Sequence, residues 1–208
     1  MQIEIRSDQE ARITGYVNAT EKQSRPVITP HGKVVEVIEP RAFAEAIERG
    51  GDISLNVDHD KGHVYAYTSD GTLKLTEDAI GLHADVLIRD PTLIALAKDG
   101  KIRGWSFGMY NVRDELEPRA EALPLRRIRG LDLDHVSLIV NQTPVYSATS
   151  VEVRADADVW NEVRSLEDRA EITDHSPREE PAPAPEPDDG ARDRAARKIQ
   201  LMRARRRE

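Results

Sequence analysis

Three short segments of the sequence combine residue types that could carry out acid–base or nucleophilic chemistry. The first holds a histidine between two aspartates, Asp58-His59-Asp60, at the end of an apolar run. The second places a serine between two aromatic residues and two glycines, Gly104-Trp105-Ser106-Phe107-Gly108. The third, Asp134-His135-Val136-Ser137, opens another apolar run with a second histidine. Ser106, His59 and His135 are therefore the candidate catalytic residues.

These residue types meet the requirements of a serine hydrolase. A serine hydroxyl is a poor nucleophile at neutral pH, so a histidine within about 3 Å must accept its proton. A third group must orient that histidine and stabilise its charged form. The oxyanion needs hydrogen-bond donors, for which the amides of Phe107 and Gly108 are candidates, because glycine allows close approach.

Each segment also has a structural interpretation that involves no chemistry. A histidine between aspartates at a strand end is commonly a solvated turn residue. A serine between glycines is commonly a β-bulge or a tight turn, and a histidine that enters a strand is often only a hydrogen-bonded part of it. Triad members are neighbours in space rather than in sequence, so the spacing alone does not assemble them.

The segment around Ser106 also matches the G-x-S-x-G motif of α/β-hydrolases. That motif needs a buried strand before it and a helix after it, whereas Asp114, Glu115, Glu117 and Pro118 follow here. A globular part of about 155 residues is also too short for the doubly wound sheet of that fold. We therefore reject the α/β-hydrolase interpretation.

A metal site is the other alternative chemistry, formed by His59 and His63 with Asp58 or Asp60. A spacing of four residues between two histidines suits a helix. Gly62 interrupts the segment, however, and apolar strand-like runs flank it. We expect no metal and no other cofactor.

The elements that must position these residues are many short strands and two helices. Residues 40–50 predict a helix that ends at a glycine, and Asp90-Pro91 predicts the start of a second helix that runs to residue 99. Strands are predicted at residues 3–5, 13–17, 34–38, 53–57, 64–68, 73–76, 82–88, 102–109 and 135–140. The pattern suits a small barrel or sandwich, and the predicted fold class is α+β, a small and mainly antiparallel β-barrel with a few surrounding helices.

The composition limits the kind of protein that this chain can be. Its 208 residues include 38 acidic and 30 basic ones, a net charge of -8, which argues against a surface that coats nucleic acid. There is no cysteine, so disulfides, thiolate zinc sites and cysteine nucleophiles are excluded. No apolar run approaches the roughly 18 residues of a membrane span, and the N-terminus lacks the pattern of a signal peptide. We expect a soluble protein of a reducing compartment.

A change of composition after about residue 155 predicts four parts. Residues 1–154 form the globular domain, and residues 155–175 a charged helical connector. Residues 176–190 form an acidic linker with five prolines, which favours an extended and disordered chain. Residues 191–208 form a basic helical tail with eight Arg or Lys and two acids.

Five segments within residues 13–148 carry a resemblance to a known family. They are Gly15-Tyr16-Val17, Ile38-Glu39-Pro40-Arg41-Ala42-Phe43, His59-Asp60, Gly81-Leu82 and Gly104-Trp105-Ser106-Phe107-Gly108-Met109. In this order the chain resembles the prohead maturation proteases of tailed bacteriophages. Those are serine peptidases related in fold to the herpesvirus capsid assembly protease.

The resemblance assigns roles to the candidate residues. Ser106 matches the nucleophile of the family and His59 its catalytic histidine. The glutamate that the family usually has near the end of the domain is replaced by His135. The herpesvirus relatives have a Ser-His-His triad, so the resemblance implies a triad of Ser106, His59 and His135, with Asp134 as the alternative to His135. Because a histidine cannot match the charge of a carboxylate at neutral pH, we expect modest turnover.

The resemblance also implies a function and a location. It predicts a serine endopeptidase inside the immature capsid, the prohead, in the host cytoplasm. Its substrates are the scaffolding protein, the major capsid protein and the chain itself, with self-processing sites expected within residues 150–190. It implies a homodimer, and we expect no membrane and no nucleic-acid partner, with the basic tail as a docking handle. The alternative is an inactive capsid-assembly module with the same fold.

Overall fold

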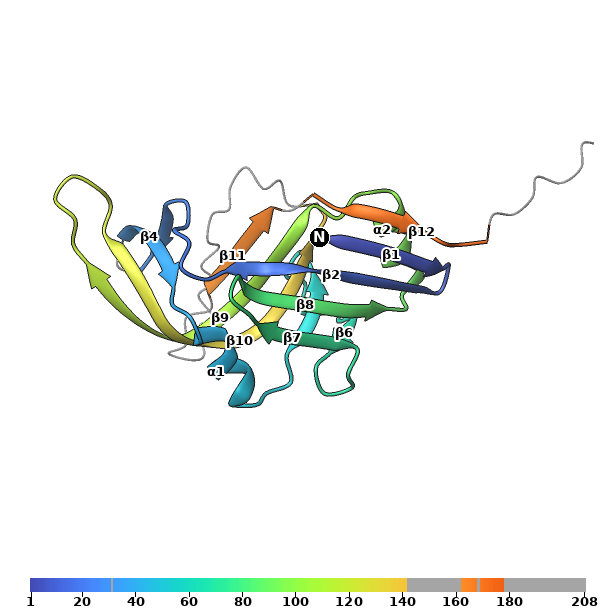
Figure 1. The fold of residues 1–208 in the computed structure, drawn as a ribbon, viewed down its shortest axis with the longest axis horizontal. Coiled ribbons are helices and arrows are strands. Elements are labelled where there is room, and N and C mark those ends of the chain that lie inside the picture. Colours follow the sequence, from blue (N-terminus) through green and yellow to red (C-terminus); the bar gives the residue numbers. More distant parts are fainter. Residues whose placement is uncertain (31, 142–161, 168, 178–208) are drawn as a thin grey trace, which may run out of the picture. The chain divides into compact units, whose positions relative to one another are not determined.

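A computed structural model of the chain describes residues 1–30, 32–141, 162–167 and 169–177. The chain divides into two units, Met1–Ser176 and Pro177–Glu208, and almost all described residues belong to the first. The described elements are, in chain order, β1 (Gln2–Ser7), β2 (Glu10–Ala19), β3 (Val27–Thr29), β4 (Gly32–Ile38), α1 (Ala42–Glu48), β5 (Ser54–Val57), β6 (Ala66–Tyr67), β7 (Leu73–Glu77), β8 (Gly81–Ile88), α2 (Pro91–Lys98), β9 (Gly104–Glu117), β10 (Leu125–Ile139), β11 (Glu162–Glu167) and β12 (Glu171–Asp174) (Figure 1).

The first sheet has the strand order β12-β1-β2-β8-β7. In β8 the apolar residues Leu82, Ala84, Val86 and Ile88 are buried and alternate with partly exposed residues, among them His83 and Asp85, as the sequence pattern predicts. All its neighbouring strands are antiparallel except β1 and β12. One face of this sheet therefore contributes to the hydrophobic core.

The second sheet has the order β11-β9-β10-β4-β3, with β5 and β6 attached to it through β10. The strand β10 is long enough for its two halves to have different neighbours on the same side. Its residues Leu125–Ile128 pair with β4, and His135–Leu138 pair with β5. The antiparallel neighbour β9 runs along the other side. This arrangement brings the end of β5, where His59 follows, next to the third candidate segment.

Both sheets contribute to one hydrophobic core, which also receives the two helices. Phe43 of α1 and Phe107 of β9 are fully buried and pack edge to face, with ring centroids 5.3 Å apart. The predicted start of α2 is confirmed, because the Asp90 carboxylate accepts the Leu93 amide at 2.8 Å and Pro91 is the first helical residue. The helix α1 ends before Gly50, which has a φ of +76°.

The mixed α+β class, with mostly strands and two helices, is confirmed for the described residues, but the predicted barrel is wrong. A closed barrel needs an unbroken ring of hydrogen-bonded strands. In the described part of the chain, no strand pairing joins the two sheets, so each keeps its own edge strands.

The predicted helical connector also differs from the structure. Of residues 155–175, the described part forms the strands β11 and β12 instead of a helix. Their charged sequences have little strand pattern, but β11 pairs with β9 and β12 with β1, and this pairing overrides the local preference. The predicted linker beyond residue 177 and the predicted basic helix at 191–208 lie outside the described residues.

None of the helices in the described ranges is both long and apolar enough to cross a membrane.

Candidate active site

The turn that carries His59 follows directly after the buried strand β5. Asp58 and His59 both have left-handed backbone conformations, with φ of 49° and 63°, which are uncommon for residues other than glycine. The Asp58 carboxylate holds the turn by accepting the amides of Val140, at 2.9 Å, and Asn141. The His59 amide donates to the Ser137 hydroxyl at 3.0 Å. The strained turn is thus fixed to the end of β10.

Ser106 lies in β9, and the strand β10 lies between β9 and the strand β5 that leads into the His59 turn. It pairs directly with Ser137 of β10, and Gly108 pairs with His135. Side chains that face each other across a strand pair lie on the same side of the sheet. Ser106, Ser137 and His135 therefore share the face on which the His59 turn is attached.

The structure gives a different reason for a glycine at position 108 from the one that the sequence suggested. A Cβ atom at this position would lie 2.5 Å from Cε1 and 2.8 Å from Nδ1 of His135. The imidazole ring thus occupies the space that the missing side chain leaves free. The close approach that glycine permits here is that of His135.

Asp134 and His135 face each other although they are consecutive in one strand. Consecutive strand residues normally point to opposite faces. The register of β10 against β9 shifts between Leu133 and His135, which face the consecutive residues Met109 and Gly108. Asp134 is the extra residue of this β-bulge, and a bulge can redirect a side chain. Its carboxylate Oδ2 lies 2.8 Å from Nδ1 of His135 and also forms an ion pair with Lys61.

The two histidines are joined in turn, because Nδ1 of His59 lies 2.7 Å from Nε2 of His135. An ionised carboxylate only accepts hydrogen bonds, so Nδ1 of His135 carries the proton that it donates to Asp134. In neutral His135, Nε2 is then an acceptor, and His59 donates to it from Nδ1. The lone pair of His59 is consequently on Nε2, which is buried and has no hydrogen-bond partner among the residues that the structure describes. That nitrogen has the electronic state of a general base.

The surroundings of the histidine pair lower two pKa values. Burial, and next the proximity of His135, lower the pKa of His59 to about 4. The hydrogen bond from His135, together with Lys61, lowers the pKa of Asp134 to about 2. At neutral pH, His59 is therefore uncharged and able to accept a proton, while Asp134 is ionised.

The hydroxyl of Ser106 has a partner outside this chain of hydrogen bonds. Ser106 is fully buried, and its Oγ donates to the carbonyl oxygen of Arg164 in β11 at 2.7 Å. Within the described residues Nε2 of His59 has no hydrogen-bond partner, so it and the Ser106 hydroxyl are not hydrogen-bonded to each other. All three predicted site residues and the alternative, Asp134, thus belong to one region of the second sheet.

The residues of the alternative metal site are not gathered in the same way. His63 stacks on Tyr65 with ring centroids 4.4 Å apart, whereas His59 contacts His135. Within the described ranges, no group of three or more His, Asp or Glu is placed to hold a metal ion.

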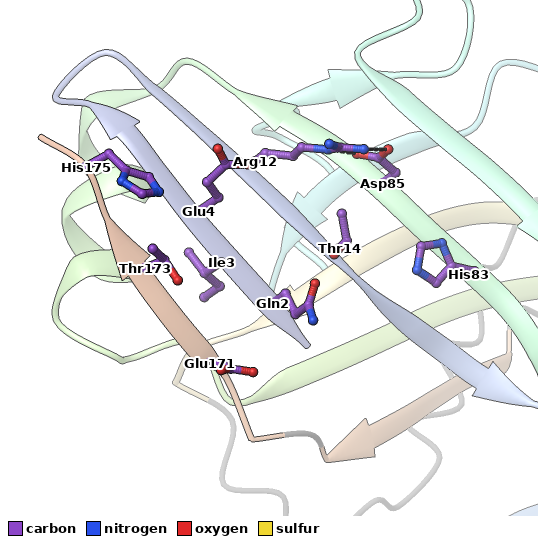
Figure 2. A pocket seen from close by; sticks show the side chains of 10 residues that line it. All are labelled: Gln2, Ile3, Glu4, Arg12, Thr14, His83, Asp85, Glu171, Thr173 and His175. Atoms are coloured by element: carbon purple, nitrogen blue, oxygen red, sulfur yellow. Dashed lines mark hydrogen bonds and ion pairs between the residues drawn. The ribbon is translucent and has the colours of Figure 1, made fainter.

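A hollow of about 490 Å³ lies elsewhere, over the first sheet (Figure 2). Its Arg12 guanidinium is already paired with Asp85, Nε to Oδ1, at 2.8 Å. None of the predicted site residues lines it, and we do not assign chemistry to it. Its lining residues are Gln2, Ile3, Glu4, Arg12, Thr14, His83, Asp85, Glu171, Thr173 and His175.

Sequence reasoning missed two features of the site. The bracing of His59 by the Ser137 hydroxyl had no signal, because a serine in an apolar strand fits many environments. Glu36, a glutamate inside the apolar run of β4, did offer a signal, since a buried carboxylate needs a partner. One of its partners, Arg164, lies 128 residues away in the sequence.

Comparison with models of known protein families matches residues 1–162 to one family, described as the caudovirus prohead serine protease. No curated protein matches the chain, and no solved structure does.

Proposed function

Because the chain belongs to the caudovirus prohead serine protease family, we propose that it is a serine endopeptidase in which Ser106 is the nucleophile and His59 the general base. The family supports a serine peptidase of the viral prohead in general terms. The residue roles rest on the geometry of the site. The observation that carries them is the buried Nε2 of His59, which has no partner in the described part of the chain and ends the series of hydrogen bonds from Asp134 through His135.

The proposed reaction proceeds through an acyl-enzyme. The O–H bond of Ser106 rotates from the Arg164 carbonyl oxygen towards His59, the proton passes to Nε2, and Oγ attacks the carbonyl carbon of the substrate. His59 then gives the proton to the leaving amine as the C–N bond breaks. A water molecule, deprotonated by His59, releases the acyl group and restores Ser106.

The hydrogen-bonded chain behind His59 stabilises the charge that forms on it. When Nε2 takes a proton, Nδ1 keeps its hydrogen bond to His135, and the ionised Asp134 lies behind that ring. His135 orients the base, and Asp134 in turn orients His135. Asp134 is therefore a positioning residue in addition to the three members of the triad. Since the ring of His135 separates the carboxylate from His59, the stabilisation is weaker than that by a directly bonded carboxylate, and we expect modest turnover.

We propose capsid proteins as the substrates, namely the scaffolding protein and the major capsid protein, and also the chain itself. The family implies such substrates and a location inside the prohead. A homodimer and a fold shared with the herpesvirus capsid assembly protease belong to the same proposal. A histidine in the third position of the triad, as in those relatives, supports it.

A fluorophosphonate probe tests the proposed function, because it reacts only with an activated serine. We expect the wild-type chain to be labelled at Ser106, and Ser106→Ala and His59→Ala to remain unlabelled. Ser69→Ala, at an exposed turn, is the matched control and should be labelled like the wild type. A folded wild-type chain that takes up no probe would instead support the inactive capsid-assembly module.

A further inference from the structure

The strand β11 lies against the nucleophile's strand as a bound peptide would. It runs antiparallel to β9 (Figure 1), and its register places Ser165 opposite Ser106 and Arg164 opposite Phe107. The carbonyl oxygen of Arg164 is the group that receives the Ser106 hydrogen bond, at 2.7 Å. Peptides are commonly recognised by adding an extended strand to a sheet edge, where the main chain gives affinity and the side chains give specificity. Among the peptide bonds of β11, the bond after Arg164 is therefore the one whose carbonyl oxygen is hydrogen-bonded to Ser106.

The side chain of Arg164 is held by a buried carboxylate. Arg164 is 8% exposed and Glu36, in β4, is 3% exposed. The guanidinium binds Glu36 through two nitrogens, from Nη2 to Oε1 at 2.6 Å and from Nε to Oε2. Two parallel hydrogen bonds of this kind are the strongest arrangement between arginine and a carboxylate.

The carboxylate of Glu36 is shared between two arginines. It also accepts from Nη1 of Arg126 at 2.8 Å, and Arg126 forms a further ion pair with Asp114. Removing one partner of a buried ion pair is costly, because it takes a compensating charge from the group that stays buried. A neutral or acidic residue in place of Arg164 would not supply the positive partner that Glu36 has there.

We propose that β11 occupies the place of the substrate strand beside β9, and that Glu36 makes the enzyme cleave after arginine or lysine. This inference rests on the proposed function and names its specificity. Arg164 then marks the substrate residue whose carbonyl carbon Ser106 attacks, and Glu36 is the residue that selects its side chain.

In the chain itself the corresponding bond is that between Arg164 and Ser165. Its hydrolysis would follow the steps given above: Ser106 is acylated by the Arg164 carbonyl, and the amine of Ser165 leaves with the proton from His59. Water then releases a new carboxyl terminus at Arg164. The bond lies within residues 150–190, where self-processing was expected from the sequence.

A purely structural role for β11 is the competing explanation, with the ion pair as part of a permanent sheet. The two explanations differ in what they predict for peptides added from outside. A permanent strand has no bearing on which peptide is cleaved. A strand in the place of the substrate predicts that peptides copying it are cleaved after the basic residue.

The experiment uses the full-length chain and quenched fluorescent peptides that copy residues 162–167. The position of Arg164 is filled with arginine, lysine, glutamine or glutamate in otherwise identical peptides. We expect cleavage directly after the varied residue, with kcat/KM for arginine and lysine at least about tenfold above that for glutamine, and lowest for glutamate. In Glu36→Gln the arginine rate should fall towards the glutamine rate. Glu39→Gln, at a partly exposed carboxylate just after β4, is the matched control and should keep the preference.

Equal rates for the four peptides would overturn the inference, as would an unchanged arginine preference in folded Glu36→Gln. So would a chain whose Ser106 reacts with the fluorophosphonate but which cleaves none of the four peptides. Absence of probe labelling is a separate result, because it removes the proposed function itself. Circular dichroism of each variant shows that it is folded, and Glu36→Asp, which keeps the charge, serves in place of Glu36→Gln if the latter is not.

Discussion

The buried position of His59 predicts activity that persists in acid. The pKa of this histidine is about 4, against an ordinary value of 6.5, because burial and the neighbouring His135 disfavour its charged form. That difference corresponds to about 3 kcal/mol against placing a proton on His59 in the folded protein. Only the uncharged ring can act as the base, so the reactivity of Ser106 should fall with a midpoint near pH 4.

The assay is the second-order rate of fluorophosphonate labelling between pH 3.5 and 8, with circular dichroism at each pH to confirm the fold. A midpoint close to 6.5 would refute the reasoning, since it would mean that His59 is as well solvated as a free histidine.

The same pKa difference makes a prediction for stability. In the unfolded chain the pKa of His59 is near 6.5, so between pH 6.5 and about 4 the unfolded state binds more protons than the folded state. The free energy of unfolding therefore decreases as the pH falls through this window, by about 2 kcal/mol at pH 5. Urea unfolding at pH 7.5 and pH 5 should show a smaller decrease in His59→Gln than in the wild type. An identical decrease in both would contradict the assignment. Asp134 does not interfere, because its low pKa places its contribution at lower pH.

Three substitutions and one control test other parts of the account. Gly108→Ala would place a Cβ 2.5 Å from the ring of His135 and force it out of its hydrogen bonds, so labelling should slow by about ten- to a hundredfold. Gly51→Ala has no heavy atom within 4 Å and should leave the rate unchanged; equal effects of the two would count against the steric argument. Asp134→Asn removes a charge-assisted hydrogen bond, and the labelling rate at pH 7.5 should fall by about tenfold or more; an unaltered rate would exclude Asp134 as a positioning residue. Phe43→Ala empties a fully buried site and should lower the free energy of unfolding in urea by about 3–5 kcal/mol, whereas a loss below about 1 kcal/mol would mean that the core is less tightly packed than described.

Much of the fold was predictable because its signals are local. The cap at Asp90 and the proline after it specify the start of α2, and the alternation in β8 specifies which face is buried. The strand β11 was not predictable in this way. Its sequence is charged, and it becomes a strand because the edge of β9 offers hydrogen bonds that its own sequence does not reveal.

The sequence indicates which residues belong to the site better than it indicates how they are hydrogen-bonded to one another. Ser106, His59 and His135 stand out by residue type and context, and the structure brings their segments together. The role of Asp134 could not be read, because strict alternation would point it away from His135, and only the β-bulge turns it back. The pairing of Glu36 with Arg164 depends on strands far apart in the sequence, and a single sequence carries no record of such a contact.

Intact-mass spectrometry of the full-length chain is the most direct test of the central claim that Ser106 is the nucleophile of an endopeptidase. Wild-type protein, Ser106→Ala protein and a mixture of the two are incubated side by side. The account predicts that the wild type is shortened, that Ser106→Ala alone keeps its full mass, and that the wild type cuts Ser106→Ala in the mixture, with a new terminus after Arg164. Equal masses for the wild type and Ser106→Ala after incubation, whether both intact or both cut, would contradict it.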